Sequence, residues 1–368
     1  MKKNLLVSLL FIVGISTGFS QSDLQSTLNQ LAGKAAEGYI APVSQALLTN
    51  VNGGLFHKAP QTKLFGLDLE IGVAVMGTPF KDDEKSFSNS NQFTFNKIQA
   101  DDIAAQAYSG TNQAQIRAAI SEKLQSTLTD INISGPSVTG KPYDPADPAS
   151  EVILEITTPS IDVDVDGNGT VDQTVAVGGK KVNTGLGGVK AISDLSMVPF
   201  AAPQITFGTV FGTQVTVRYM PKYKVENFGD LSWTGFGIQH NLGYWLPIPV
   251  VDVAASFYTQ KIKIDPLFEL SGTSFGLNVS KQFGFGFLNA TPYAGFMLES
   301  SKFTVNYTPP IADFGPGVTP PTVNFEIEGK NTSRLVVGLS LRLLIININA
   351  DYNIGKYNSF TGGVFFAI

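Results

Sequence analysis

The residues best suited to bind a metal ion form an acidic run in the middle of the chain, DVDVDGNGTVDQ. Its oxygen-bearing residues, at the first, third, fifth and ninth positions of a calcium-binding loop, are Asp164, Asp166, Asn168 and Asp172. Alternating carboxylates offer several hard oxygens to a hard cation, and Gly169 allows the bend. The glutamate that usually completes such a loop is replaced by Val175, and no helices flank the run. The run predicts either a weak Ca²⁺ site or a solvated hairpin turn, and we expect no other cofactor.

Acid–base catalysis has few candidates in this chain. There are two histidines, His57 in GGLFHKAP and His240, whose nearest candidate catalytic partners are Ser232 and Asn241. A catalytic histidine needs a nucleophile or carboxylate beside it, and neither position carries such a motif. The GxGxxG, P-loop and HExxH motifs are absent. We therefore expect no enzymatic activity and interpret both histidines as structural or interfacial, with an outer-membrane hydrolase as the remaining alternative.

Charged residues of both signs occupy polar positions within alternating segments. They are Asp68, Glu70, Arg218, Asp252, Glu299, Arg334, Arg342 and Asp351. Opposite charges can pair across an enclosed space, where an unpaired charge would be costly. We predict that these eight residues face a lumen.

The run RLVVGLSLRLLIININADYN, Arg334 to Asn353, shows which element would position such residues. Its apolar residues alternate with polar ones at period two. A strand places Asn347, Asn349, Asp351 and Asn353 on one side, whereas a helix would distribute them round most of its circumference. A soluble sheet turns its apolar face to a core, whereas a membrane barrel turns that face to lipid and its polar face to the lumen.

The composition of the 368 residues favours lipid as the outer environment. Hydrophobic residues make up 43% of the chain but charged residues only 15%, against roughly 25% in soluble domains. The net charge of −5 gives no basic surface for nucleic acid. Cysteine is absent, which excludes disulfides and thiolate metal sites.

The first 20 residues predict a secretory signal peptide. Lys2 and Lys3 precede an apolar run from Leu5 to Val13, and small residues precede a cleavage site between Ser20 and Gln21. The apolar run is shorter than the ~20 residues that a membrane-spanning helix needs. No cysteine follows the cleavage site, so a lipoprotein anchor is excluded.

The remaining chain predicts an N-terminal helical segment, residues 21–62, followed by a barrel, residues 63–368. Apolar residues at helical spacing follow Ser22, so this segment is either a plug or a periplasmic cover. Segments of ~10 alternating residues separated by turns are typical of a membrane barrel. The β pattern breaks in an insertion over residues 98–150, which contains a predicted helix from Asn112 to Leu128 and whose side of the membrane stays open.

Two runs and the end of the chain carry a resemblance to a known class of proteins. The runs are GLGGVKAISDLSMVPFAAPQITFGTVFGTQVTVRYMP, Gly185 to Pro221, and GIQHNLGYWLPIPVVDVAASF, Gly237 to Phe257. Alternation from Phe360 to the last residue, Ile368, resembles the closing strand by which the barrel assembly machinery recognises its substrates. The chain resembles an uncharacterised family of Gram-negative outer-membrane β-barrels, distantly similar to FadL-type long-chain fatty-acid transporters.

The resemblance implies an all-β fold, a monomeric antiparallel transmembrane β-barrel of about 12–14 strands within the range known for such proteins. It implies localisation in the outer membrane, contact with lipid, and binding or passage of small hydrophobic molecules. The alternative is a non-transporting surface scaffold that docks protein partners.

Overall fold

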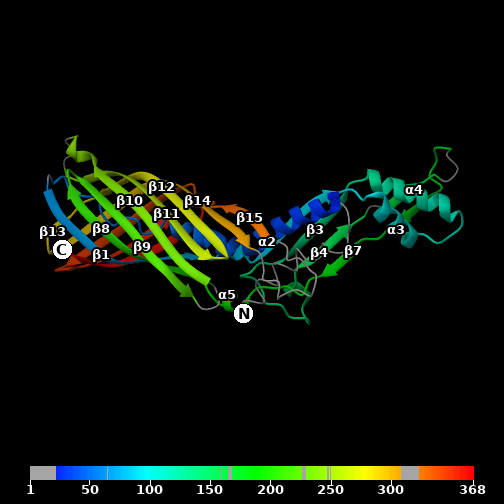
Figure 1. The fold of residues 1–368 in the computed structure, drawn as a ribbon, viewed down its shortest axis with the longest axis horizontal. Helices are drawn as coiled ribbons and strands as arrows, with labels where there is room; N and C mark the ends of the chain where they lie inside the picture. Colours follow the sequence, from blue (N-terminus) through cyan, green and yellow to red (C-terminus); the bar gives the residue numbers. More distant parts are fainter. Residues whose placement is uncertain are drawn as a thin grey trace. The chain divides into compact units, whose positions relative to one another are not determined.

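The computed structural model describes residues 22–63, 65–158, 160–164, 168–225, 229–246, 248, 250–307 and 323–368. The predicted signal peptide, residues 1–20, lies outside them. The described chain divides into two compact units (Figure 1). The barrel unit contains residues 42–81 and 195–368, and the insert unit contains residues 22–41 and 82–194.

Ten antiparallel strands of the barrel unit form a closed ring. In order round the ring they are β1 (Phe65–Pro79), β8 (Met197–Val210), β9 (Thr213–Val225), β10 (Gly229–Asn241), β11 (Asp252–Asp265), β12 (Phe268–Ser280), β14 (Leu288–Tyr307), β16 (Ser333–Leu343), β17 (Ile346–Ile354) and β18 (Ser359–Ala367). The last strand closes on the first, with Val73 opposite Val364. Two shorter strands, β13 (Phe283–Phe285) and β15 (Val323–Glu328), pair with β14 outside the ring. The predicted antiparallel barrel is confirmed.

The predicted number of 12–14 barrel strands is wrong, because ten of the described strands form the wall. The alternating stretches near Ala294 and near Phe303 belong to one continuous strand, β14, which is 20 residues long. The β-patterned segments near Phe93 and from Val152 to Val163 pair within the insert unit instead of joining the wall. Alternation marks a strand in either setting, so it could not show which sheet each strand would join.

Side chains alternate between the outside and the inside of the ring with apolar residues outward. Along β17 every second residue is buried, and the buried ones are Asn347, Asn349, Asp351 and Asn353. On β16, Leu339 is 44% exposed while its neighbour Ser340 is 2% exposed. This arrangement is the inverse of a soluble sheet and is the one that a lipid-facing barrel requires.

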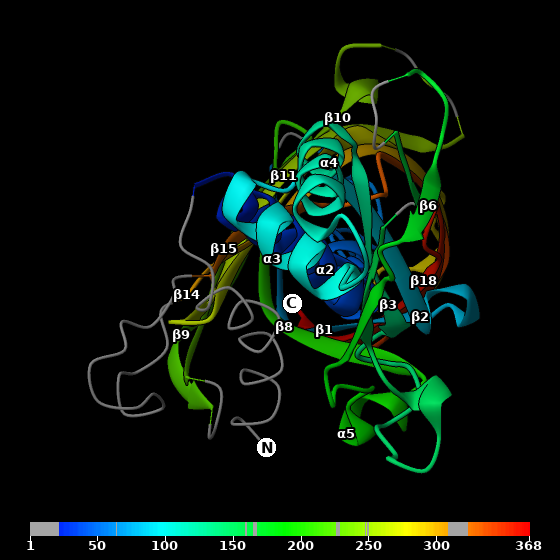
Figure 2. The same cartoon turned by 90° about the vertical axis from the view of Figure 1, so that its right-hand side faces the viewer.

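The insert unit has its own small sheet, formed by β2 (Ser86–Phe93), β3 (Thr129–Pro136), β4 (Ile153–Thr157) and β7 (Lys180–Asn183). Helices α3 (Lys97–Ala107) and α4 (Gln113–Ser126) lie side by side (Figure 2). A separate hairpin joins β5 (Ser160–Val163) and β6 (Gln173–Ala176), and a short helix, α5 (Lys190–Ser193), follows β7. The insert therefore extends beyond the predicted 98–150, because β2 before that range and β4 and β7 after it join one sheet through β3.

Helix α2 (Ser22–Val51) belongs to both units, which divide at Ala41 and Pro42. In the insert unit, the Tyr39 hydroxyl donates to the carbonyl of Gly187 at 2.8 Å. The part from Pro42 to Val51 lies within the barrel unit. None of the described helices combines the length and hydropathy needed to cross a membrane.

Replacing an outward apolar residue tests this arrangement. Leu339→Arg places a charge in the middle of the outward apolar face, and we expect it to cost about 2–4 kcal/mol of stability in a bilayer. Unfolding by urea in liposomes, followed by heat-modifiable gel mobility, measures the loss. Asn306→Arg, at an exposed position where β14 extends to pair with β15, is the control and should have little effect. Equal effects at both positions would contradict the outward assignment.

Candidate lumen site

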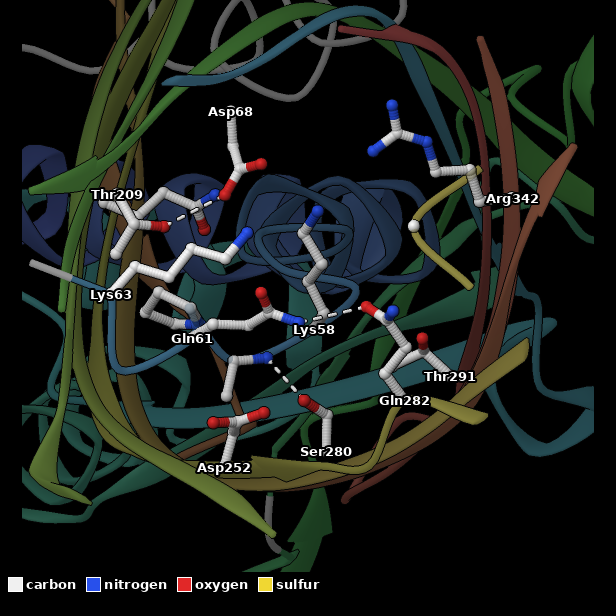
Figure 3. A pocket seen from close by; sticks show the side chains of 14 residues that line it. Lys58, Gln61, Lys63, Asp68, Thr209, Asp252, Ser280, Gln282, Thr291 and Arg342 are labelled. Atoms are coloured by element: carbon white, nitrogen blue, oxygen red, sulfur yellow. Dashed lines mark hydrogen bonds between the residues drawn. The ribbon is translucent and has the colours of Figure 1, made fainter. Parts of the chain in front are cut away.

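Residues 42–63, here called the lumen segment, pass through the middle of the ring. Figure 3 shows wall strands surrounding side chains of this segment, with helix α2 behind them. Wall side chains donate hydrogen bonds to its backbone carbonyls: Arg334 to Thr49, Gln260 to Val51, Arg218 to Gly54, Gln239 to Lys58 and Asn241 to Pro60. These carbonyls lie at the end of a helix or in irregular chain, so side chains must satisfy them when they are buried.

Apolar contacts hold the same segment against one part of the wall. Leu55 and Phe56 join a buried cluster with wall residues Tyr258, Tyr293, Met297 and Val336. A Cβ atom at wall residue Gly295 would lie 2.5 Å from the Phe56 ring, so glycine makes room for the aromatic side chain. Gly54 has a φ of +60°, a conformation that favours glycine. The segment therefore fits the wall in shape as well as in hydrogen bonding.

Glu70 is the centre of the first buried charge cluster. Its carboxylate lies 2.7 Å from Nε2 of His57 and 2.6 Å from Nζ of Lys58, and its side chain is 1% exposed. The His57 ring also stacks on Phe365. Because a buried carboxylate is costly without a partner, the two basic residues of the lumen segment stabilise a wall charge that would otherwise face an empty space.

Two arginines form the other buried clusters. Arg334 pairs with Glu299 at 3.1 Å and donates to the carbonyl of Thr49 at 2.7 Å. Arg218 donates to the side chains of Gln204 and Gln260, and its guanidinium lies over the Trp233 ring. Each arginine thus connects wall strands with the lumen segment.

A cavity of about 130 Å³ lies at the end of the ring that carries the β8–β9 and β16–β17 turns (Figure 3). Charged and polar side chains dominate its lining: Lys58, Gln61, Lys63, Asp68, Thr209, Gln214, Asp252, Ser280, Gln282, Thr291 and Arg342. Thr209 donates to Asp68 at 3.1 Å, and Gln61 donates to Gln282 at 3.1 Å. Such a lining suits water or a polar solute better than an apolar molecule.

The structure places the eight predicted lumen-facing residues in two groups. Buried among the clusters described above or bonded to their neighbours are Glu70, Arg218, Glu299, Arg334 and Asp351. The other three, Asp68, Asp252 and Arg342, line the cavity. Sequence reasoning missed the partners that the lumen segment supplies, His57 and Lys58, because that irregular stretch has no periodicity to show where its side chains point.

Both ring nitrogens of His240 have partners. Nδ1 lies 2.9 Å from the Thr213 hydroxyl, and Nε2 accepts a hydrogen bond from the Trp245 indole at 2.6 Å. Ser232 is not among these partners, and the Asn241 amide donates to the lumen segment and to Asp252. The absence of enzymatic activity stays a prediction.

The acidic run connects β5 and β6 as a hairpin loop. Asp164 accepts a hydrogen bond from the Gly169 amide at 2.7 Å, and Asn168 accepts one from the Thr170 amide at 2.8 Å. Asp166 lies outside the described residues, and Asp172 pairs through its backbone with Val163. In the parts of the chain that the structure describes, no three acidic or histidine side chains form a cluster suited to a metal ion. Calcium binding stays a prediction.

A family model described as "Family of unknown function (DUF6588)" matches residues 1–368. The chain belongs to the DUF6588 family. This match gives the family no activity, so the transport role implied by the FadL-type resemblance stays a prediction. The comparison with curated proteins finds no match to this DUF6588 chain.

Solved structures of outer-membrane proteins are also similar to this DUF6588 protein. The loop L8 deletion mutant of OmpT from Vibrio cholerae is 10% identical, with 82% of this chain and 98% of that chain covered and a TM-score of 0.25. The N-terminal β-barrel domain of Pseudomonas aeruginosa OprF is 17% identical, with 42% and 94% covered and a TM-score of 0.19. These values are low, so the barrel assignment rests on the strand pairing itself.

Removing one partner of the Arg334–Glu299 pair should destabilise the barrel. Arg334→Met leaves Glu299 buried without its cation, and we expect a loss of about 3–5 kcal/mol. Denaturant unfolding in detergent micelles measures it. The double variant Arg334→Met/Glu299→Gln should recover part of the loss. Lys302→Met, which breaks the exposed pair with Glu326, is the control and should change stability little. Strict additivity of the two buried substitutions would show that the pair is not coupled.

Proposed function

We propose that this DUF6588 protein is a monomeric outer-membrane β-barrel that is closed by its own N-terminal segment and acts as an anchor. In this proposal the barrel holds the insert unit at one face of the membrane, where a protein partner binds. The outward rows of Leu, Ile, Val and Phe on the wall support contact with lipid. The C-terminal strand β18, which pairs with β1, is the strand that the assembly machinery would recognise.

The observation that carries the proposal is the set of hydrogen bonds and ion pairs between the wall and the lumen segment. Five wall side chains donate to its backbone carbonyls, and its His57 and Lys58 pair with the buried Glu70 of the wall. The cavity of about 130 Å³ lies at one end of the barrel, beside Lys58, Gln61 and Lys63 of the lumen segment. A segment held in this way closes the barrel and supports an anchor better than a conduit.

The passage of small hydrophobic molecules is supported less well. Ligand sites for apolar molecules are lined mainly by hydrophobic and aromatic side chains. The cavity here is lined by Lys58, Lys63, Asp68, Asp252 and Arg342 together with amides and hydroxyls. We therefore propose no hydrophobic cargo, and we propose no enzymatic reaction.

The connections between strands supply an orientation. The longest connections, between β1 and β8 and between β14 and β16, lie at one end of the barrel. The other end, here called the short-turn end, carries the β8–β9 and β16–β17 turns and the C-terminus, and its longest connection is the ten residues between β10 and β11. The chain passes between the units after Ala41, Lys81 and Asp194, and β1 ends and β8 begins at the opposite end. Bacterial barrels keep short turns in the periplasm and long connections outside. In our proposal the insert unit is therefore on the cell surface.

Conductance in planar bilayers tests the closed barrel. The full-length mature protein should give no steady current, because the lumen segment fills the ring. A variant lacking residues 21–60 should give steady ohmic currents through the polar lumen that remains. Arg218→Ala/Gln260→Ala, which removes two of the wall contacts, should give brief openings. Steady conductance by the full-length protein, equal to that of the deletion variant, would contradict the proposal.

Labelling of intact cells tests the orientation. Because the chain has no cysteine, a thiol reagent reacts only with the cysteine that is introduced. Thr111→Cys, at an exposed position of the insert unit, should react with a membrane-impermeant maleimide on intact cells. Thr62→Cys, exposed at the short-turn end, should react only after the outer membrane is permeabilised. The reverse pattern would place the insert unit in the periplasm.

A further inference from the structure

The connections at the short-turn end of the barrel carry large apolar side chains where water-facing turns usually carry polar ones. Six of these side chains come from four turns, and we call them the apolar rim: Phe211, Trp245, Phe285, Phe287, Leu344 and Ile345. Each is between 53% and 72% exposed in the barrel unit. Exposed apolar side chains gathered at one end of a barrel mark an interface with something other than water.

The backbone of these turns shows that apolar side chains are kept at a conformational cost. Phe211, Val250 and Leu344 have φ values of 49°, 81° and 58°. Glycine, Asn and Asp adopt positive φ readily, whereas β-branched and bulky residues do so only under strain. Turn formation alone would favour Asn or Gly at these three positions, so another requirement selects the apolar side chains.

Among the six rim side chains only Trp245 has a polar atom, and that atom has a partner inside the protein. The Trp245 indole N–H donates to Nε2 of His240 at 2.6 Å, and Tyr244 packs edge-on against Trp245. The indole therefore needs no water to satisfy its donor. A tryptophan in this state is suited to the apolar side of a membrane interface.

The height of the wall supplies an independent argument. On β11 the outward residues run from Val253 through Phe257 to Thr259 before the first outward charge, Lys261. At about 3.3 Å per residue and a tilt near 40°, this stretch is roughly 15 Å tall, whereas the apolar band of such barrels is about 25 Å. The wall alone is too short on this strand, and the rim supplies the missing apolar height.

The opposite end of the barrel is polar, so the apolar band is displaced toward the rim. Outward ion pairs there join Lys261 to Glu269 at 2.5 Å and Lys302 to Glu326 at 2.9 Å. At the rim end, the charged residues Lys58, Lys63, Asp68, Asp252 and Arg342 line the cavity. Outward ion pairs thus lie at one end of the barrel, and charged cavity-lining side chains lie at the other.

We propose that the apolar rim is immersed in the acyl-chain region of the adjacent leaflet, so that these turns are anchored in lipid instead of projecting into water. The rim continues the outward face of the wall, which is the lipid-facing surface of the proposed function, and the inference rests on that function. The occupant is bulk lipid, not a bound partner protein.

Site-directed nitroxide labels in liposomes of purified protein test this proposal. Phe285→Cys and Leu344→Cys report on the rim, Leu339→Cys on the middle of the wall, and Lys356→Cys on the polar turn at the opposite end. Rim labels should be more accessible to oxygen than to nickel ethylenediaminediacetate, as at Leu339, whereas the label at Lys356 should show the reverse. Rim labels as open to the nickel reagent as the Lys356 label would overturn the proposal, since no partner protein is present.

The wall label keeps the two proposals distinguishable. If Leu339 reports lipid while the rim reports water, the immersed rim is wrong and the membrane barrel stands. If Leu339 also reports water, the membrane barrel itself is wrong.

The substitution Leu344→Asn provides a second test that does not depend on labels. Asparagine suits the positive φ of this turn, so in water the variant would be as stable as the parent or more stable. In lipid the exposed amide is unfavourable, and we expect a lower urea midpoint in liposomes. Asn358→Ala, in the polar turn at the opposite end, controls for general effects of turn substitution. An unchanged or higher midpoint for Leu344→Asn would argue against immersion.

Discussion

Backbone hydrogen bonding of the strands sets the conditions for the rest of the barrel unit. In a bilayer no water is present to satisfy a free amide or carbonyl, so a sheet can cross only if its two edges meet. Here β1 pairs with β18 over eight residue pairs, from Glu70 opposite Ala367 to Gly77 opposite Phe360. Closure fixes which face of every strand points inward. As a result, Glu70, Arg218 and Arg334 lie in an enclosed interior.

An enclosed polar interior creates a second requirement, which the lumen segment meets. Buried charges need partners and buried carbonyls need donors. The segment brings His57 and Lys58 to Glu70, and the wall brings Arg334, Arg218 and Gln260 to the segment's carbonyls. The wall and the segment therefore satisfy each other, which explains how a lumen lined by so many ionisable groups can be stable while largely filled.

The same closure separates two surfaces with different solvents. Inside the ring, polar groups are matched with polar groups over short distances. Outside it, the apolar rows are exposed, and at the short-turn end they continue into turns that carry Phe, Trp and Leu. Two of these residues, Phe211 and Leu344, have positive φ values that favour Gly or Asn. The residue types in these turns are therefore explained better by the apolar surface that they continue than by the backbone conformation that they adopt.

The sequence by itself determined the strands and the direction of their faces, because a period of two depends only on neighbouring residues. Asn347, Asn349 and Asp351 had to share one side of β17 whatever the fold. The order of strands, the ring of ten and the membership of β2, β4 and β7 in a separate sheet were decided by pairings between distant residues, which local periodicity does not record. The same holds for the lumen: the acidic and basic wall residues could be predicted from alternation, but their partners in residues 42–63 could not. Beyond Val51 that segment is irregular, and only the closed ring brings His57 to Glu70 or the carbonyl of the helical residue Thr49 to Arg334.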